Sequence, residues 1–240
     1  MSEPSAGSNR LLPLVMGYVA GYVDGCTFVA LFGLFVAQVT GSFVVAGAVL
    51  TGHAPTSLVT ILAIPAFVFG AAAAAALNAI SRRRQWRAAA ILLALECLLL
   101  AAMLAVALCL PGLGNADQPA ALITGLLGLC AMGVQNAFVR LELPGAPSTN
   151  VMTTNVGMLA TDATELLMAR LLRGGSPSAR ADSDDARRRL AKTGPIVLSF
   201  LAGTISGTLA CRQLGFACLA LPAALLAAAA AIAARRPTAP

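Results

Sequence analysis

Polar residues recur in two short clusters within a strongly apolar chain. The first cluster is the run Gly21-Tyr22-Val23-Asp24-Gly25, followed by Thr40-Gly41-Ser42. The second is the run Gly133-Val134-Gln135-Asn136-Ala137, followed by Thr153-Thr154-Asn155. Carboxylates, amides and hydroxyls are costly at membrane depth, so such residues indicate a functional site. Their repetition predicts two related halves that meet around a shared site.

Asp24 is the strongest candidate, because it is the one carboxylate in the two clusters. It either binds a proton, a cation or a polar group of a substrate, or it locks the halves together through hydrogen bonds. No basic residue lies at comparable depth, so we expect its partners to be hydroxyls, amides or backbone N–H groups. Gln135 and Asn136 replace this carboxylate in the second half, where neutral amides bind a solute or join helices. Glu96, alone in a later apolar segment, is a second protonatable group or a structural carboxylic acid.

The other polar residues of the clusters are expected at the tips of re-entrant segments. Helix ends there expose N–H and C=O groups that bind ions or polar solutes, unless their hydrogen bonds merely seal the turns. No catalytic residue, metal ligand or cofactor is predicted. The predicted solute-binding or ion-binding residues are Asp24, Gln38, Thr40, Gly41, Ser42, Glu96, Gln135, Asn136, Thr153, Thr154 and Asn155.

Motifs for enzyme chemistry are missing from the sequence. An intramembrane enzyme needs a nucleophile with a base, or a cluster of metal ligands. The chain has no HExxH, GxSxG or Walker motif, and its only histidine is His53. We therefore expect neither an enzyme nor an ATP-driven pump. The six cysteines form no CxxC pair, and we expect small buried hydrophobes rather than disulfides or metal ligands. They are Cys26, Cys97, Cys109, Cys130, Cys211 and Cys218.

Composition places the chain in a lipid bilayer. Of its 240 residues 58% are hydrophobic and 11% are charged, and the mean hydropathy is +0.83, whereas soluble domains carry about 25% charged residues. Several uncharged stretches of about 20 residues are long enough to cross a hydrocarbon core of about 30 Å. The net charge of +6 comes from residues at the edges of these stretches, so it does not indicate nucleic-acid binding. The sequence predicts an all-α, polytopic helical membrane protein.

The distribution of Lys and Arg predicts the topology. These residues gather in the 81–87 loop, the 170–192 stretch and the C-terminus, whereas the 111–119 loop has none. The positive-inside rule places the first three in the cytoplasm. If every apolar segment crossed, the 81–87 and 170–192 regions would lie on opposite sides of the membrane. At least one segment must therefore fail to cross.

The segments 34–51 and 150–170 are expected to be re-entrant or short, because the second is rich in polar residues and the first is its equivalent. The N-terminus, the C-terminus and a loop at 173–192 are then cytoplasmic, and this loop is expected to lead into a short basic helix from Asp185 to Lys192. If 34–51 crosses fully, the chain has seven or eight crossings instead. The six expected transmembrane helices are 11–31, 57–80, 88–110, 118–139, 194–212 and 214–234.

The two halves are expected to form an inverted internal repeat, over about 11–110 and 118–234. Besides the polar clusters, Phe67-Val68-Phe69-Gly70 matches Phe200-Leu201-Ala202-Gly203 at the equivalent place in the order of segments. Secondary transporters are often built from such repeats, with interrupted helices near the membrane midplane. Chance matching between helices rich in Ala and Gly is the alternative.

These runs also resemble a known family. Residues 21–25, Phe35 to Ser42 and Met132 to Ala137 resemble the signature of the YoaK family, also called DUF1275, and the resemblance covers nearly the whole chain. It implies a bacterial multi-pass protein of the inner membrane, but no substrate, because the family is defined by an unknown function. Members typically have Thr-Gly-Asn where this chain has Thr40-Gly41-Ser42. The second half keeps the amide as Asn155 but lacks the glycine.

The clusters and the repeat together favour a small secondary transporter or permease-like protein for a small polar or ionic solute. Asp24 is its expected coupling group. The alternative is a non-transporting membrane scaffold, sensor or lipid-interacting protein. A chain of 240 residues is also compatible with a homo-oligomer.

Overall fold

The computed structural model describes residues 8–52, 58–110, 113–115, 118–149, 151–171 and 177–235. All secondary structure in these ranges is helical, which confirms the predicted all-α class. The helices are α1 (Ser8–Ala30), α2 (Thr40–Leu50), α3 (Leu58–Arg83), α4 (Ala88–Cys109), α5 (Pro119–Glu142), α6 (Met152–Leu171), α7 (Pro177–Leu214), the 3-10 turn η1 (Gly215–Leu219) and α8 (Ala220–Arg235).

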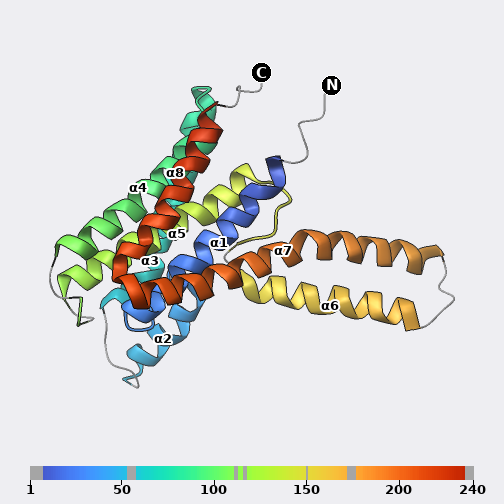
Figure 1. Ribbon diagram of the computed structural model, residues 1–240, viewed down its shortest axis with the longest axis horizontal. Coiled ribbons are helices and arrows are strands. Elements are labelled where there is room, and N and C mark those ends of the chain that lie inside the picture. The colour runs from blue at the N-terminus through green and yellow to red at the C-terminus, as the bar shows by residue number, and fades with distance from the viewer. Residues whose placement is uncertain are drawn as a thin grey trace.

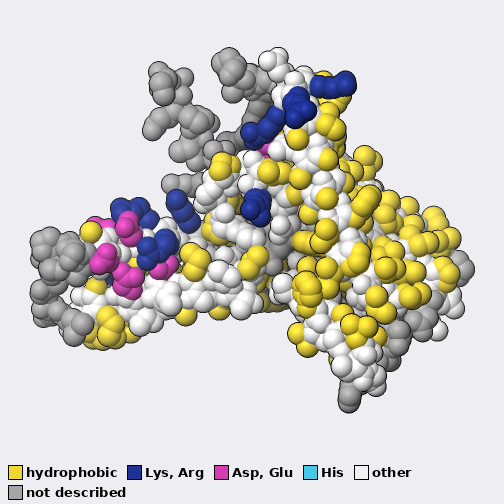
Figure 2. All heavy atoms as spheres, turned by 180° about the vertical axis from the view of Figure 1, so that it is seen from behind, with side chains coloured by type: hydrophobic (Ala, Val, Ile, Leu, Met, Phe, Trp, Pro, Cys, Tyr) yellow, Lys and Arg dark blue, Asp and Glu magenta, His cyan; other side chains and the backbone are white. Residues whose placement is uncertain are grey.

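Five stretches of the described chain are long and apolar enough to cross a membrane. Four are α1, α3, α4 and α5, and the fifth is the 55-residue stretch 181–235, which contains both α7 and α8. Helix α2 has 11 residues, so it is about 16 Å long and too short to span a hydrocarbon core. In Figure 2 hydrophobic side chains cover the bundle, and charged side chains gather at its upper end and on a projecting arm. The fold is that of a polytopic helical membrane protein.

Two pairs of helices form the centre of the bundle, and the helices of each pair run parallel. Residues 17–25 of α1 follow residues 196–204 of α7 in the same direction. Residues 59–67 of α3 follow residues 125–133 of α5 in the same way. Each pair therefore joins one helix from the first part of the sequence to one from the second part.

Helices α1 and α5 run in opposite directions. The Gln135 side chain of α5 reaches Met16, near the start of α1, whereas Gly128 lies beside Val36, beyond the end of α1. Helix α1 is therefore antiparallel to α3, and α2 is the one helix between them in the sequence. By the same reasoning α5 is antiparallel to α7, with only α6 between them. Neither α2 nor α6 crosses the bundle, in agreement with the re-entrant or short segments expected there.

Glycines allow the helices of each pair to approach until their backbones touch. Small residues at such crossings drive packing between membrane helices by close van der Waals contact. A methyl group at any of four glycines would lie far inside contact distance of a carbonyl oxygen on the paired helix. The distance from the added methyl carbon to the carbonyl oxygen would be 2.1 Å for Gly21 and Phe200, 2.2 Å for Gly203 and Tyr18, 2.2 Å for Gly133 and Phe67, and 2.3 Å for Gly70 and Cys130.

One end of the bundle is rich in arginine. Arg82, at the end of α3, forms an ion pair of 3.2 Å with Glu142, at the end of α5. Arg87, just before α4, donates a hydrogen bond to the Ala234 carbonyl near the end of α8. Helix α1 begins at this same end (Figure 1). The arginines of the 81–87 loop and of the C-terminal helix therefore lie on one side of the bundle.

Helix α6 and the first half of α7 form a hairpin that projects from the bundle as an arm (Figure 1). Arg189 of α7 contacts Asp162 at 2.7 Å and Glu165 at 3.4 Å, which fastens the two helices together. Helix α7 is continuous over 38 residues from Pro177. The sequence predicted a loop at 173–192 that leads into a short helix from Asp185 to Lys192. That helix is confirmed as part of α7, but residues 177–184 are also helical, because α6 supplies partners that stabilise this part of α7.

Candidate functional site

Asp24 is buried in the C-terminal part of α1, where it binds the loop that leads into α2. Its side chain is 3% exposed. The Oδ1 atom accepts hydrogen bonds from the backbone N–H groups of Val36, at 2.8 Å, and Ala37, at 2.6 Å. The Oδ2 atom has no hydrogen-bond partner in the described chain. The loop folds back because Phe32 and Gly33 both adopt a positive φ. Asp24 therefore anchors a backbone turn with one oxygen and has a second oxygen unused.

The polar residues that follow this turn lie at the start of α2. Thr40 and Gly41 are exposed, Ser42 is buried and Gln38 is half-buried. Gln38 directly follows Ala37, the second residue bound by Asp24. Ser42 is therefore the only one of these four residues that is buried.

Gln135 is the centre of the second cluster. It is fully buried on α5, and its Nε2 donates to the Met16 carbonyl at 2.8 Å and to Thr149 Oγ1 at 3.2 Å. Its Oε1 has no partner in the described residues. Gln135 therefore joins α5 both to α1 and to the loop that precedes α6.

The remaining residues of the second cluster are spread over α5 and the first turn of α6. Asn155 is buried and donates through Nδ2 to the Ser148 carbonyl at 2.6 Å, which fastens the loop before α6. Asn136 is half-buried on α5, and Thr153 and Thr154 are exposed. Gln135 and Asn155 are thus the buried amides of this cluster.

The two clusters do not form one shared site. Gln135 contacts α1 at Met16, eight residues before Asp24, which is about 12 Å along the helix axis. Each cluster binds the loop that follows its own helix, and α1 and α5 are antiparallel, so the two loops lie at opposite ends of the bundle. The sequence predicted two clusters that enter from opposite sides and share one site. The structure has their loops at opposite ends of the bundle, but it places the clusters at two depths along α1.

Glu96 lies apart from both clusters, in the middle of α4. It is fully buried, and neither carboxyl oxygen has a hydrogen-bond partner in the described chain. Its neighbours along the helix, Leu92, Leu93, Leu100 and Met103, are also fully buried. Burying a polar group without a hydrogen bond costs roughly 2–7 kcal/mol, depending on the reference state. Glu96 is therefore a costly residue that the observed packing does not explain.

Two further buried polar groups were missed by sequence reasoning. Asn78 and Ser81, on α3, are 4% and 0% exposed, and Asn78 Oδ1 and Ser81 Oγ have no partner among the described residues. Asn78 follows a run of alanines and one leucine, and this lone amide in an apolar helix is the signal that would have identified it.

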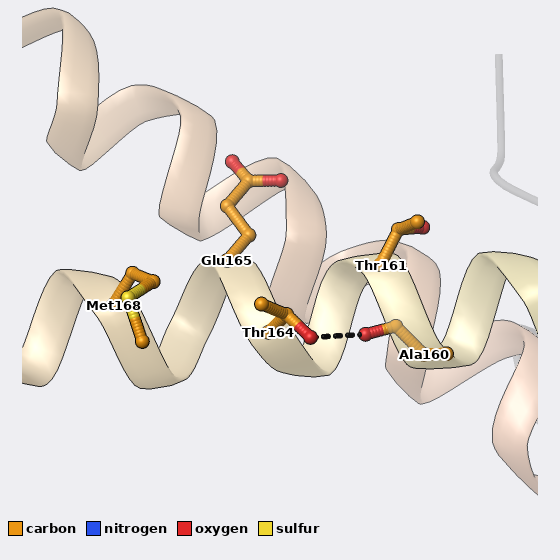
Figure 3. Close-up of a pocket in the computed structure, with 5 residues that line it drawn as sticks. All are labelled: Ala160, Thr161, Thr164, Glu165 and Met168. Atoms are coloured by element: carbon orange, nitrogen blue, oxygen red, sulfur yellow. Dashed lines mark hydrogen bonds between the residues drawn. The ribbon is translucent and has the colours of Figure 1, made fainter.

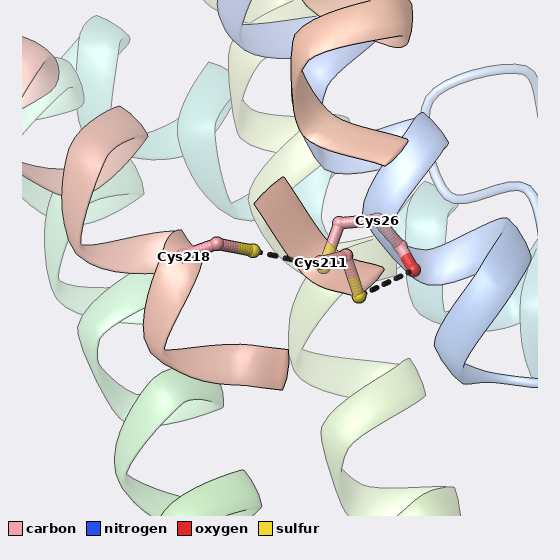
Figure 4. Close-up of side chains that lie close together, drawn as sticks. All are labelled: Cys26, Cys211 and Cys218. Carbon is pink, nitrogen blue, oxygen red and sulfur yellow. Dashed lines mark hydrogen bonds between the residues drawn. The ribbon is translucent and has the colours of Figure 1, made fainter. Parts of the chain in front are cut away.

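Three of the cysteines lie together, although the sequence analysis treated all six as separate apolar residues. Cys26 of α1, Cys211 of α7 and Cys218 of η1 are buried, and their sulfur atoms all lie within 4.8 Å of one another (Figure 4). Their sequence spacing gave no sign of this, because three different elements supply them. The sequence therefore did not predict that three sulfur atoms lie close enough together to contact one metal ion.

An open depression occurs on the arm, away from these groups. It lies on α6 and is lined by Ala160, Thr161, Thr164, Glu165 and Met168 (Figure 3). The Thr164 hydroxyl is already used, because it donates to the Ala160 carbonyl at 2.8 Å. None of the predicted site residues lines this depression.

Comparison with known proteins gives a family and no further relative. No curated protein matches the chain, and no solved structure matches it. A family model described as "Protein of unknown function (DUF1275)" matches residues 12–232. This range includes both polar clusters, Glu96 and the three grouped cysteines. The chain therefore belongs to the DUF1275 family.

Proposed function

We propose that this integral membrane protein is a small secondary transporter for a small polar or ionic solute, and that it carries out transport rather than catalysis. The observation that carries the proposal is the set of buried polar atoms on four bundle helices that have no hydrogen-bond partner in the described chain. They are Asp24 Oδ2 on α1, Asn78 Oδ1 and Ser81 Oγ on α3, both carboxyl oxygens of Glu96 on α4, and Gln135 Oε1 on α5. Such groups are rare in folded proteins, and each calls for an explanation. A second conformation, in which water, a proton or the solute reaches these atoms, explains why they are present.

The packing of the bundle supports a motion of this kind. Helices α1 and α7 form one closely packed pair, and α3 and α5 form another. Gln135 links the two pairs through its hydrogen bond to Met16. In the proposed cycle each pair moves as a rigid unit, and the contact between α1 and α5 opens first toward one side and then toward the other.

The glycine contacts also support two inverted halves, 11–110 and 118–234. Gly21 corresponds to Gly133 in the repeat, and Gly70 corresponds to Gly203. Each of the four packs against a backbone carbonyl of the other half. A pseudo-twofold axis that exchanges the α1–α7 pair with the α5–α3 pair accounts for all four contacts.

Asp24 is the proposed coupling group. Hydrogen bonds to an ionised acceptor are roughly twice as strong as those between neutral groups. Proton uptake by Asp24 therefore weakens its hold on Val36 and Ala37, and it releases the loop before α2. Gln38 and Ser42 move with this loop, so a solute bound there is exposed or enclosed according to the state of Asp24. Glu96 is the second protonatable group.

The arginine-rich end of the bundle is proposed to face the cytoplasm of a bacterial cell, with the protein in the inner membrane. Arg82, Arg83, Arg84 and Arg87 lie at this end with the last turn of α8, and cytoplasmic loops carry an excess of such residues. The start of α1 then also faces the cytoplasm.

Reconstitution into vesicles with an imposed pH gradient tests the proposal. Amino acids, polyols, nucleosides and small carboxylic acids are added singly, and proton movement and solute uptake are recorded. At least one class should drive proton movement above that of protein-free vesicles, and Asp24→Asn should abolish the coupling. A Thr161→Ser variant on the arm is the matched control. Flux unchanged by Asp24→Asn would remove Asp24 from the mechanism.

A second candidate, a non-transporting scaffold, is favoured by the arm. Helix α6 exposes large apolar side chains at Val156, Leu167, Met168 and Leu171, because in the described chain it packs against α7 alone. A second copy of the chain or another membrane protein would cover this surface. Absence of flux for every solute class, together with an oligomer that Leu167→Glu dissociates, would favour this alternative.

A further inference from the structure

We infer that Cys26, Cys211 and Cys218 form a binding site for a soft, thiol-seeking metal ion, with copper(I) as the favoured occupant. The three thiols come from α1, α7 and η1, and the sequence separates the first from the other two by more than 180 positions. The Cys26 and Cys218 sulfur atoms are 3.5 Å apart, and all three lie within 4.8 Å of one another. This inference does not depend on the proposed transport.

The spacing of the sulfur atoms suits a bound ion. Three sulfur ligands around a metal at about 2.3 Å lie about 4 Å from one another in a planar arrangement. The Cys26 and Cys218 sulfur atoms are 3.5 Å apart, and all three sulfur atoms lie within 4.8 Å of one another, so their separations are compatible with this value. Small side-chain rotations are sufficient to close the three sulfurs around an ion.

The ligand chemistry selects the class of metal. All three ligands are sulfur, and soft thiolate ligands favour copper(I) and zinc over the hard cations magnesium and calcium. Structural zinc is almost always bound by four ligands in a tetrahedron, whereas this group supplies three thiols. Copper(I) is therefore the better match. Each thiol that becomes a ligand releases one proton to solvent, so binding weakens as the pH falls.

The surroundings hold the three thiols in place. Cys211 Sγ lies 3.6 Å from the Cys26 carbonyl oxygen, and the Tyr22 hydroxyl donates to the Cys218 carbonyl at 3.1 Å. Tyr22 thereby fixes the η1 corner against α1. Figure 4 shows the three side chains converging from separate helical segments.

The three thiols lie near one end of the bundle. Cys26 lies four residues before the end of α1, Cys211 lies three residues before the end of α7, and η1 connects α7 to α8. The site is therefore about one helical turn below the end of the bundle that is opposite the arginine-rich end. Asp24 is only two residues from Cys26, but residues two apart on a helix do not face each other. The thiol site and the Asp24 anchor are distinct.

The other three cysteines provide a matched control. Cys97 and Cys130 donate singly to helix carbonyls, of Ala223 and Ala66, each at 3.3 Å, and Cys109 is exposed. One variant replaces Cys97, Cys109 and Cys130 by alanine and keeps the site. The other replaces Cys26, Cys211 and Cys218 and removes it.

The test is an anaerobic titration of reduced full-length protein in detergent with copper(I), in competition with a coloured copper(I) chelator. Wild type and the variant that keeps the site should each bind one ion and unfold at a higher temperature with copper present. The variant that lacks the site should bind none and show no such rise. If it fails to fold, Cys218→Ala alone should still weaken binding by about tenfold or more.

Parallel measurements give the outcomes that would overturn the inference. Equal copper binding by the two triple variants, or none by wild type, would show that the three thiols are not a site. A disulfide between Cys26 and Cys218 in freshly isolated protein, detected by mass spectrometry, would assign the pair to redox chemistry instead. Tighter binding of zinc than of copper(I) would overturn the choice of ion.

Discussion

Replacing Gly21 by alanine should separate α1 from α7. The added methyl carbon would lie 2.1 Å from the Phe200 carbonyl oxygen, and the next nearest atoms are also backbone atoms of α7. Ordinary contact begins at 3.4 Å, so the substitution lacks about 1.3 Å of space, and no side-chain rotation can supply it. A gap of 0.5–1 Å already removes about a quarter to a half of the dispersion energy of a contact. We expect a loss of stability at or above the upper end of the usual range of about 1–3 kcal/mol for overpacking.

Unfolding in detergent, followed by circular dichroism, measures this loss. Gly47→Ala on α2 is the matched control, because a methyl group there meets no atom within 4 Å. Gly133→Ala is the equivalent change in the α3–α5 pair, with a distance of 2.2 Å to the Phe67 carbonyl oxygen, so its effect should be similar. A Gly21→Ala protein as stable as the Gly47→Ala control would refute the close crossing of α1 and α7. A large difference between Gly21→Ala and Gly133→Ala would refute the equivalence of the two pairs.

Three further substitutions test the buried polar groups, each by unfolding in detergent alongside flux in vesicles. Asp24→Leu should lower the free energy of unfolding by about 2–6 kcal/mol, because it leaves the N–H groups of Val36 and Ala37 buried without acceptors. Asp24→Asn should lower it by less and still abolish the coupling of flux to protons. Equal losses of stability in the two variants would contradict the anchoring role of Asp24. Glu96→Met should raise the free energy of unfolding by about 1–4 kcal/mol, because it replaces a buried carboxyl that has no partner in the described chain by an apolar group. The same variant should abolish solute flux. A loss of stability would instead assign Glu96 a structural role. Gln135→Leu should cost about 1–3 kcal/mol through the lost bond to Met16; no loss would remove Gln135 as the link between the helix pairs.

The fold was largely predictable because a small number of physical rules determine where membrane helices lie in a sequence. Length, apolar composition and the arginines of the 81–87 loop predicted the crossing helices, and the polar content of 150–170 predicted that this segment does not cross. The loop prediction for 173–192 was wrong for residues 177–184, whereas the expected short helix from Asp185 to Lys192 is confirmed as part of α7. The segment has low apolar content, but Arg189 pairs with Asp162 and Glu165 on α6. That pairing depends on tertiary structure and has no signature within the segment itself.

The burial of three candidate site residues was predictable from the sequence, but their arrangement was not. Asp24, Glu96 and Gln135 are buried, as expected for polar groups at membrane depth, and Asp24 binds backbone N–H groups, one of the partner classes that the sequence indicated. The two clusters were expected to enter from opposite sides and share one site. They do not share a site, because each binds the loop that follows its own helix. The grouping of three cysteines was also invisible, because it arises where α1, α7 and η1 meet.

The most direct test of the proposed transport is two-sided labelling of a single cysteine at position 136, in a chain whose six native cysteines are replaced by alanine. Asn136 is half-buried and adjoins Gln135, where the two helix pairs are linked. A thiol reagent that cannot cross membranes is applied to right-side-out and to inside-out vesicles. Alternating access predicts labelling from both sides, with an imposed pH gradient shifting the ratio of the two rates. Labelling from one side only, unaffected by the gradient, would contradict it.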